Sequence, residues 1–188
     1  MNLCDPYPDR VQVDGKTYLL DLSLRNVLHA IEVPKTEGIT PGAAAQVQCA
    51  WLLAEKERVP ADTAVCERIL QAVLDLFPKA EDGREKYIDF EQDAALIRSG
   101  FMRIGIDLTR EDIHFLQFME LLADLPADTA LMRTVQLRQA PVPEITQHNK
   151  EQVARLLEAK QRVALKLTEE ERRARFERQL MQNRVFWG

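Results

Sequence analysis

The chain has 188 residues, of which 46% are hydrophobic and 29% charged, and these values exclude a disordered chain. Its net charge of −5 excludes a global positive field that would attract nucleic acid, and the one densely basic stretch, ERRARFERQLMQNR, is interleaved with glutamates as on a solvated helix face. The three cysteines, Cys4, Cys49 and Cys66, are widely spaced, which argues against a disulfide or zinc framework and favours a reducing compartment.

The sequence shows no segment that directs the chain into or across a membrane. The N-terminal stretch MNLCDPYPDR lacks the basic segment and the apolar run of a signal peptide. The most apolar window, AAAQVQCAWLLAEK, is too short and too interrupted by glutamine to span a bilayer. We therefore expect a soluble, intracellular protein without a membrane partner.

A β-hairpin is predicted for residues 11–20. Two short alternating segments flank Asp14 and Gly15, a dipeptide that supplies the positive φ angles of a tight two-residue turn. A helix is predicted next, with Ser23 as its N-cap. Its apolar stripe consists of Leu24, Val27, Leu28 and Ile31.

Two further helices are predicted for residues 42–57 and 61–77, after a loop rich in proline and glycine. Their predicted buried stripes are Val47, Ala50, Trp51 and Ala54 in the first, and Val65, Ile69, Ala72, Val73 and Leu76 in the second. Cys49 and Cys66 lie within these patterns, so we interpret them as small core residues.

The stretch YIDFEQDAALIRSGFM places acids at alternate positions, as some metal sites do. Ligands at alternate positions converge only on a strand or in a loop, and on a helix Glu91 points away from Asp89 and Asp93. The apolar residues that follow have helical spacing, and Asp89 with Gln92 fits a capping box. The pattern therefore predicts a helix start, and a metal-dependent enzyme that uses these acids is the weaker hypothesis.

The next helix is predicted to begin near residue 109, after Gly105 ends the previous one. Its start signals are Thr109 as N-cap, Glu111 and Asp112 in the first turn, and a hydrophobic staple of Leu108 and Ile113. Phe115 and Phe118 widen the apolar face of this helix, which indicates a position at the centre of the core.

A breaker with two prolines, APVPEI, follows a shorter predicted helix and marks a boundary. Beyond it, residues 146–167 and 168–185 are charge-rich helical patterns with a thin apolar stripe. The predicted fold is mainly α: a small N-terminal β-hairpin, a compact helical bundle and a charged C-terminal helical extension. The predicted domains are residues 1–140 and 141–188.

Motifs that carry chemistry are missing from the sequence. It has no G-x-S-x-G elbow, phosphate-binding glycine loop, Rossmann fingerprint or H-E-x-x-H pair. The three histidines, His29, His114 and His148, have no second histidine or cysteine at ligand spacing. We therefore expect a protein that is not an enzyme and needs no cofactor or metal.

Three stretches together resemble the bacteriophage gene-product-fifteen family of tailed phages. They are VQVDGKTYLLDLSLRNVL, VPADTAVCERILQAVLDLF and YIDFEQDAALIRSGFMRIGIDLTREDIHFLQFMELLADLPADTALMRTVQLR. The last is similar to the family pattern of an acidic opening, an aromatic-rich helix and a closing arginine. The resemblance covers residues 10–140. Leu24 stands where the family has an aromatic residue, and IHFLQF lacks the family's paired tryptophans.

The resemblance implies a tail-assembly chaperone in the host bacterial cytoplasm. Such a protein binds the tape-measure protein, and possibly other tail proteins, before the tail tube forms; we also expect self-association and no nucleic-acid partner. The alternative is a structural component of the mature tail or connector. Wide or terminal apolar groups make Phe115, Phe118, Phe186 and Trp187 the candidate partner contacts.

Overall fold

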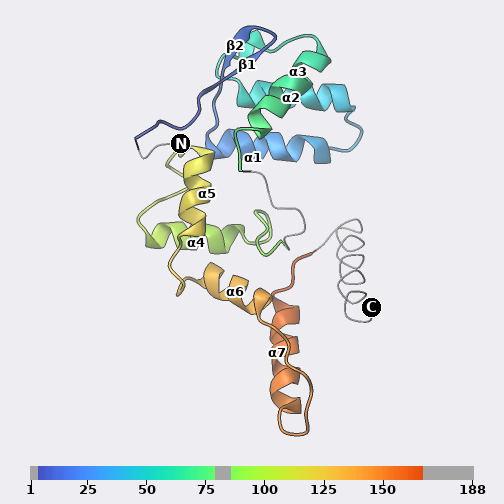
Figure 1. Ribbon diagram of the computed structural model, residues 1–188, viewed down its shortest axis with the longest axis vertical. Coiled ribbons are helices and arrows are strands. Elements are labelled where there is room, and N and C mark those ends of the chain that lie inside the picture. The colour runs from blue at the N-terminus through green and yellow to red at the C-terminus, as the bar shows by residue number, and fades with distance from the viewer. Residues whose placement is uncertain (1–3, 79–85, 167–188) are drawn as a thin grey trace, which may run out of the picture. The chain divides into compact units, whose positions relative to one another are not determined.

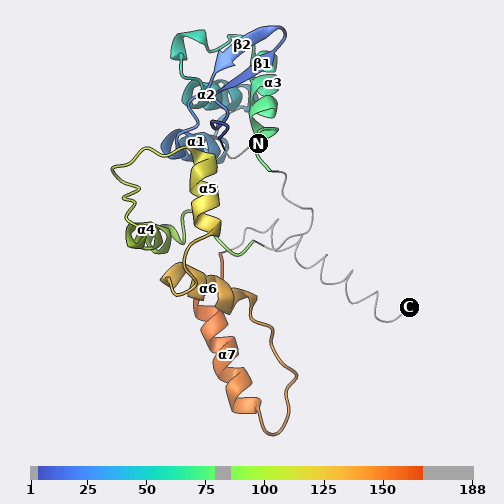
Figure 2. The same ribbon diagram turned by 60° about the vertical axis from the view of Figure 1, so that its left-hand side comes forward.

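The computed structural model describes residues 4–78 and 86–166 (Figures 1 and 2). In these residues it has one two-stranded antiparallel sheet, seven α-helices and two short 3-10 helices, which confirms the mainly α fold with an N-terminal hairpin. The elements are β1 (Arg10–Val13), β2 (Lys16–Leu19), α1 (Leu24–Glu32), η1 (Val33–Lys35), α2 (Pro41–Leu52), η2 (Lys56–Arg58), α3 (Thr63–Leu74), α4 (Ala94–Arg103), α5 (Phe115–Ala123), α6 (Ala130–Gln139) and α7 (Lys150–Arg162).

The described residues form two compact units. The first unit contains residues 4–78 and 108–124, so that α5 joins the N-terminal elements, and the second contains residues 86–107 and 125–166. The predicted domains, residues 1–140 and 141–188, are a statement about which parts of the chain fold independently. The contacts that define the two units do not test independent folding, so this boundary stays a prediction. None of the helices in the two described ranges is both long and apolar enough to cross a membrane.

The predicted hairpin is confirmed. Asp14 and Gly15 have φ angles of 53° and 74°, the two positive values that a tight turn between twisted strands requires. Val11 pairs with Tyr18 and Val13 with Lys16. Val11, Val13 and Tyr18 are buried, and β1 packs on α3, so one face of the hairpin covers the helices (Figure 1).

Helix α2 ends five residues before its predicted end because the chain returns to the hairpin. Leu53 forms a bridge with Leu20, and the N–H of Asp21 donates to the carbonyl of Leu52 at 2.8 Å. At the other end, the hydroxyl of Thr40 accepts from the N–H of Ala43, so Thr40 caps the helix. Main-chain pairing with the hairpin therefore decides where α2 stops.

The predicted buried stripe of α2 is wrong for two of its four residues, and the other two, Ala50 and Trp51, are half-buried. Val47 and Ala54 are exposed, while the residues that face the core are Ala44, Ala45, Cys49 and Leu52. α2 has no charged residue and is apolar around most of its circumference, so its pattern does not identify one face. Packing against α1 and α3 decides which side is buried.

The predicted start of α5 is also wrong. The helix begins at Phe115, and its N-cap is His114, whose Nδ1 accepts from the N–H of Leu116 at 3.1 Å. Thr109 lies in a turn, and Glu111 and Asp112 lie in the irregular stretch between that turn and the helix. Residues 113–115 are held in an extended bridge, because Leu24 N–H donates to Ile113 and Phe115 N–H donates to Leu22.

Helix α1 begins where predicted, but its cap is different. Ser23 occupies the N-cap position without a capping side-chain hydrogen bond; its own N–H donates to the carboxylate of Asp21. In the second unit, Gly105 ends α4 with a φ of +86°, and Ile106 N–H donates back to Phe101, as in a Schellman motif. Gly105 is therefore the helix stop that the sequence predicts.

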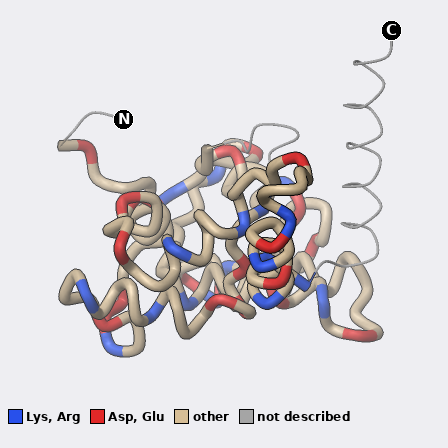
Figure 3. Tube along the Cα trace, turned by 90° about the horizontal axis from the view of Figure 1, so that it is seen from below, with Lys and Arg blue, Asp and Glu red and all other residues tan. Residues whose placement is uncertain are grey.

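In the second unit α4 packs on α6, and α6 on α7. Gly100 of α4 lies close to Leu125 in the segment before α6, where an added Cβ would be 3.0 Å from a methyl of Leu125. Basic and acidic residues are interspersed in the described residues, with no charged residue between positions 38 and 54 (Figure 3). Residues 168–185, which are predicted to form a helix, lie outside the described residues.

Candidate partner-binding site

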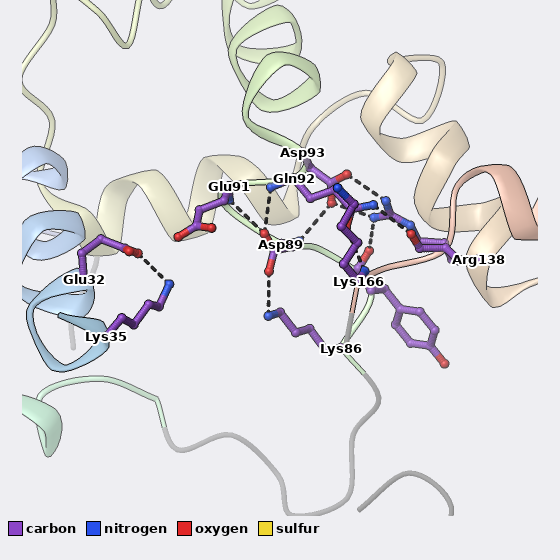
Figure 4. Close-up of polar contacts among 11 residues, drawn as sticks. Glu32, Lys35, Lys86, Asp89, Glu91, Gln92, Asp93, Arg138 and Lys166 are labelled. Carbon is purple, nitrogen blue, oxygen red and sulfur yellow. Dashed lines mark hydrogen bonds and ion pairs between the residues drawn. The ribbon is translucent and has the colours of Figure 1, made fainter. Parts of the chain in front are cut away.

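The acidic stretch 89–93 forms a hydrogen-bonded turn that leads into α4 (Figure 4). The Oδ1 atom of Asp89 accepts from the N–H of Glu91 at 3.0 Å and from that of Gln92 at 2.8 Å. In return, the N–H of Asp89 donates to Oδ2 of Asp93 at 2.9 Å. Asp89 therefore caps the turn that leads into α4, whereas Asp93 occupies the N-cap position of the helix itself, and the reciprocal acceptor is Asp93 and not Gln92.

The pKa of Asp89 is lowered from its ordinary value. Burial alone would raise this pKa, but the N–H of Gln92 and the ammonium of Lys86, at 2.9 Å, stabilise the carboxylate and outweigh burial. Asp89 is thus ionised and already engaged at neutral pH.

Asp93 forms a buried ion pair with Arg138, the last arginine of the family-like stretch (Figure 4). The two carboxylate oxygens accept from Nη1 at 2.6 Å and from Nη2 at 2.8 Å, in a two-point geometry. The side chains are only 3% and 7% exposed. Arg138 also donates to the carbonyls of Tyr87 and Val163, at 2.7 and 2.6 Å, so each of its three guanidinium nitrogens donates at least one hydrogen bond.

The ion pair was detectable in the sequence, although we did not predict it. Arg138 follows the buried residues Leu131 and Val135 at helical spacing, so it lies on the apolar stripe of α6. A charge in such a stripe requires a partner. In the residues that the structure describes, no group of three or more histidines, cysteines or acids has a geometry that could hold a metal.

Gln92 uses its side chain to hold a distant part of the main chain. Its Nε2 donates to the carbonyl of Ala164 at 2.8 Å, and its Oε1 accepts from the N–H of Lys166 at 2.9 Å (Figure 4). Together with the bond from Arg138 to Val163, this fixes the chain just after α7. These contacts make the acidic turn a structural centre of the second unit.

The four predicted partner contacts have different outcomes. Phe115 and Phe118 belong to the core of the first unit, at 9% and 2% exposure, and Phe115 packs edge-on against Phe77 with ring centroids 5.5 Å apart. They therefore do not form the exposed apolar surface from which their role was inferred, and partner binding by them stays a prediction. Phe186 and Trp187 lie outside the described residues.

A more suitable surface lies on the outer side of α2. We define the α2 face as Ala43, Val47, Ala50 and Trp51. Val47 is 42% exposed, Ala43 is exposed, and Ala50 and Trp51 are half-buried. Their spacing of four, three and one residues places them on one stripe of the helix. An amphipathic partner helix can pack on such a stripe.

Trp51 is held in place by its neighbours. Its ring stacks on that of His29 with centroids 4.3 Å apart, and the Nζ of Lys56 lies 5.7 Å from the ring centroid. Gln48 donates to the carbonyl of Ala30 and ties α2 to α1. A half-buried, oriented tryptophan beside exposed aliphatic groups is typical of the centre of a protein interface.

The fold and this surface together define a small, mainly helical protein with a short N-terminal hairpin and a candidate protein-binding face. The family model described as Bacteriophage Gp15 protein matches residues 3–165. The chain belongs to this family of phage proteins. No curated protein and no solved structure matches the chain.

Proposed function

We propose that the protein is a non-catalytic tail-assembly chaperone that binds the phage tape-measure protein during tail morphogenesis. Membership of a phage family supports the biological setting, and the uncharged, exposed α2 face is the observation that carries the binding role. A helix that is apolar on both sides is normally buried on both sides. The outer side of α2 therefore has the character of a surface that a partner covers.

The client that fits the α2 face is a long helix with an apolar stripe. The four residues of the α2 face are uncharged and form a narrow stripe, with the Lys56 ammonium at the Trp51 end, so the face selects hydrophobic spacing along most of its length. A narrow contact is also exchangeable, as a chaperone requires when tube subunits replace it. In this proposal the protein acts in the host cytoplasm, where it covers the apolar stripe of the client helix and so prevents the client from aggregating.

The engagement of the acids supports a non-catalytic role. Asp93 is paired with Arg138, and Asp89 is occupied by main-chain N–H groups and Lys86. A catalytic role for these acids would require breaking the contacts that begin α4. Their function in the proposal is to hold the second unit together.

The proposal is tested by co-expression with the tape-measure protein of the same phage, followed by a solubility assay and co-purification. We expect the client to become soluble and to co-purify. Mass spectrometry of purified particles separates this role from a structural one. A chaperone is absent or present in traces, whereas a stoichiometric amount in mature particles would identify a structural component of the tail or connector.

A further inference from the structure

Helix α7 and residues 163–166 are held to the rest of the second unit by few side chains. We define the α7 arm as residues 150–166. Of the thirteen residues of α7, only Val153 is buried, and Leu157 remains 46% exposed. A helix of this length with one buried residue gains little from packing and depends on the contacts at its end.

Those contacts are directed at main-chain atoms. Gln92 pairs with the carbonyl of Ala164 and the N–H of Lys166, as a neighbouring strand would, and Arg138 donates to the carbonyl of Val163. In the opposite direction, the ammonium of Lys160 donates to the carbonyls of Arg138 and Ala140, at 2.8 and 2.5 Å. The same atoms exist in every copy of the chain, so an identical arm from another copy makes identical contacts.

The connection between α6 and α7 gives the arm freedom to leave. Residues 141–148 are all exposed, include Pro141 and Pro143, and contain the exposed apolar side chains of Val142 and Ile145. The hydrogen bonds of the segment are local: the N–H of Thr146 donates to Oδ1 of Asn149, and Nδ2 of Asn149 donates to the carbonyl of Glu144. When it is fully extended, the connection has an end-to-end length of roughly 25–30 Å. This exceeds the length of helix α7, which is roughly 20 Å.

We propose that the α7 arm is exchanged between two copies of the chain, so that residues 163–166 of one copy occupy the site formed by Gln92 and Arg138 of the other. In the closed form each arm docks on its own chain, and in the exchanged form it docks on the other copy. Both forms contain the same arm contacts and differ only in the conformation of the connection and in the entropy of association. A higher protein concentration therefore shifts the balance toward the exchanged dimer. This mode of self-association is independent of the client-binding role.

The test uses the full chain with Cys4→Ser, because Cys49 and Cys66 are fully buried and burial raises the pKa of Cys49 to about 12. Glu91→Cys and Lys166→Cys are made in separate chains, which keeps Gln92 and the main-chain contacts intact. The Lys166→Cys chain carries ¹⁵N. The two are mixed at high concentration, diluted and treated with a short bismaleimide.

We expect a mixed-isotope dimer cross-linked between positions 91 and 166. The control pair is Glu91→Cys with Gln152→Cys, because position 152 is exposed on the first turn of α7. The yield of mixed dimer from the first pair should exceed that from the control pair several-fold. The chain with both substitutions should cross-link within itself when dilute. A mixture that gives no more mixed dimer than the control pair would overturn the proposal.

A second measurement avoids substitutions. Unlabelled and ¹⁵N-labelled chains of native sequence are mixed and treated with a lysine cross-linker, and peptides that join Lys86 to Lys166 are analysed. Arm exchange yields peptide pairs with one light and one heavy member. Pairs that are always of one isotope would show that each arm stays on its own chain.

Discussion

The ion pair of Asp93 and Arg138 gives the sharpest prediction for a single residue. Asp93→Ala leaves a guanidinium that is 7% exposed without its counter-charge, and we expect a loss of about 3–5 kcal/mol in the free energy of unfolding. Urea denaturation measures it. The pair Asp93→Ala with Arg138→Met should be less destabilised than Asp93→Ala alone, because no buried charge remains.

Arg155→Ala is the matched control, since it breaks an exposed pair with Glu151 four residues earlier. We expect it to change stability by less than about 0.5 kcal/mol. Equal losses in Asp93→Ala and Arg155→Ala would contradict a structural role for the buried pair.

His114 makes the stability of the first unit depend on pH. Its Nδ1 accepts from the N–H of Leu116 while Nε2 lies 3.3 Å from the carbonyl of Pro8, so the folded state needs the neutral ring. Burial lowers the pKa of His114 from its ordinary value of 6.5. The Pro8 carbonyl and the nearby carboxylates of Asp21 and Glu120 act in the opposite direction, but burial outweighs them. The unfolded chain therefore takes up the proton first as pH falls.

This contribution is full above the unfolded pKa and is lost as pH falls below about 6.5 toward the folded pKa. His114→Asn keeps an N-cap acceptor that does not titrate. We expect the melting temperature of the parent chain to fall more steeply than that of His114→Asn between pH 7.5 and pH 5.5. Parallel curves for the two chains would rule out this linkage.

At the scale of single residues, the sequence predicts local roles well. Asp14 and Gly15 form the turn, Gly105 stops α4, and Asp89 caps, because each role depends on neighbours within about five residues. It does not predict the partner of Arg138, which is 45 residues away. Such pairings depend on how helices meet in space, although a charge in an apolar stripe signals that one exists.

At the scale of elements, errors arise where two signals compete. The signals at Thr109 predict a helix start, but the extended bridge of residues 113–115 with residues 22–24 delays it to Phe115. In α2, an apolar pattern on both sides hides which face is buried. Helix existence was therefore predictable for α1 to α7, whereas the start of α5 and the orientation of α2 depend on tertiary contacts.

The end of α4 provides a prediction at this scale. Gly105 has a φ of +86°, where a side chain is strained, although an added Cβ would meet nothing within 4 Å. We expect Gly105→Ala to lower the free energy of unfolding by about 1 kcal/mol. Ser99→Ala, at an exposed position in the same helix, should change it by less than about 0.5 kcal/mol. A neutral Gly105→Ala would show that this left-handed stop is dispensable.

At the scale of the whole molecule, the family resemblance predicted the phage class, and the helical spacing of apolar residues predicted the mainly α fold. The family match confirms the first and the structure confirms the second. Resemblance did not locate a binding surface. Phe115 and Phe118 have the aromatic character of interface residues, but their neighbours bury them. Only the three-dimensional arrangement reveals that the α2 face is an apolar surface on the outside of the first unit.

One proposal joins structure and function: we expect the tape-measure protein to bind the α2 face. Val47→Asp places a charge in that face at an exposed position, so it should reduce client binding at least tenfold without loss of folding, whether folding is followed by circular dichroism or by melting temperature. Leu74→Asp is the matched control, because Leu74 is 61% exposed on α3 and outside the α2 face.

The decisive measurement is the amount of tape-measure protein that co-purifies with the parent chain, with Val47→Asp and with Leu74→Asp, each expressed together with the client at equal level. We expect the parent and Leu74→Asp to retain the client and keep it soluble, and Val47→Asp to do neither. Equal recovery with Val47→Asp and the parent would contradict binding through the α2 face, and no recovery with the parent would contradict the chaperone role itself.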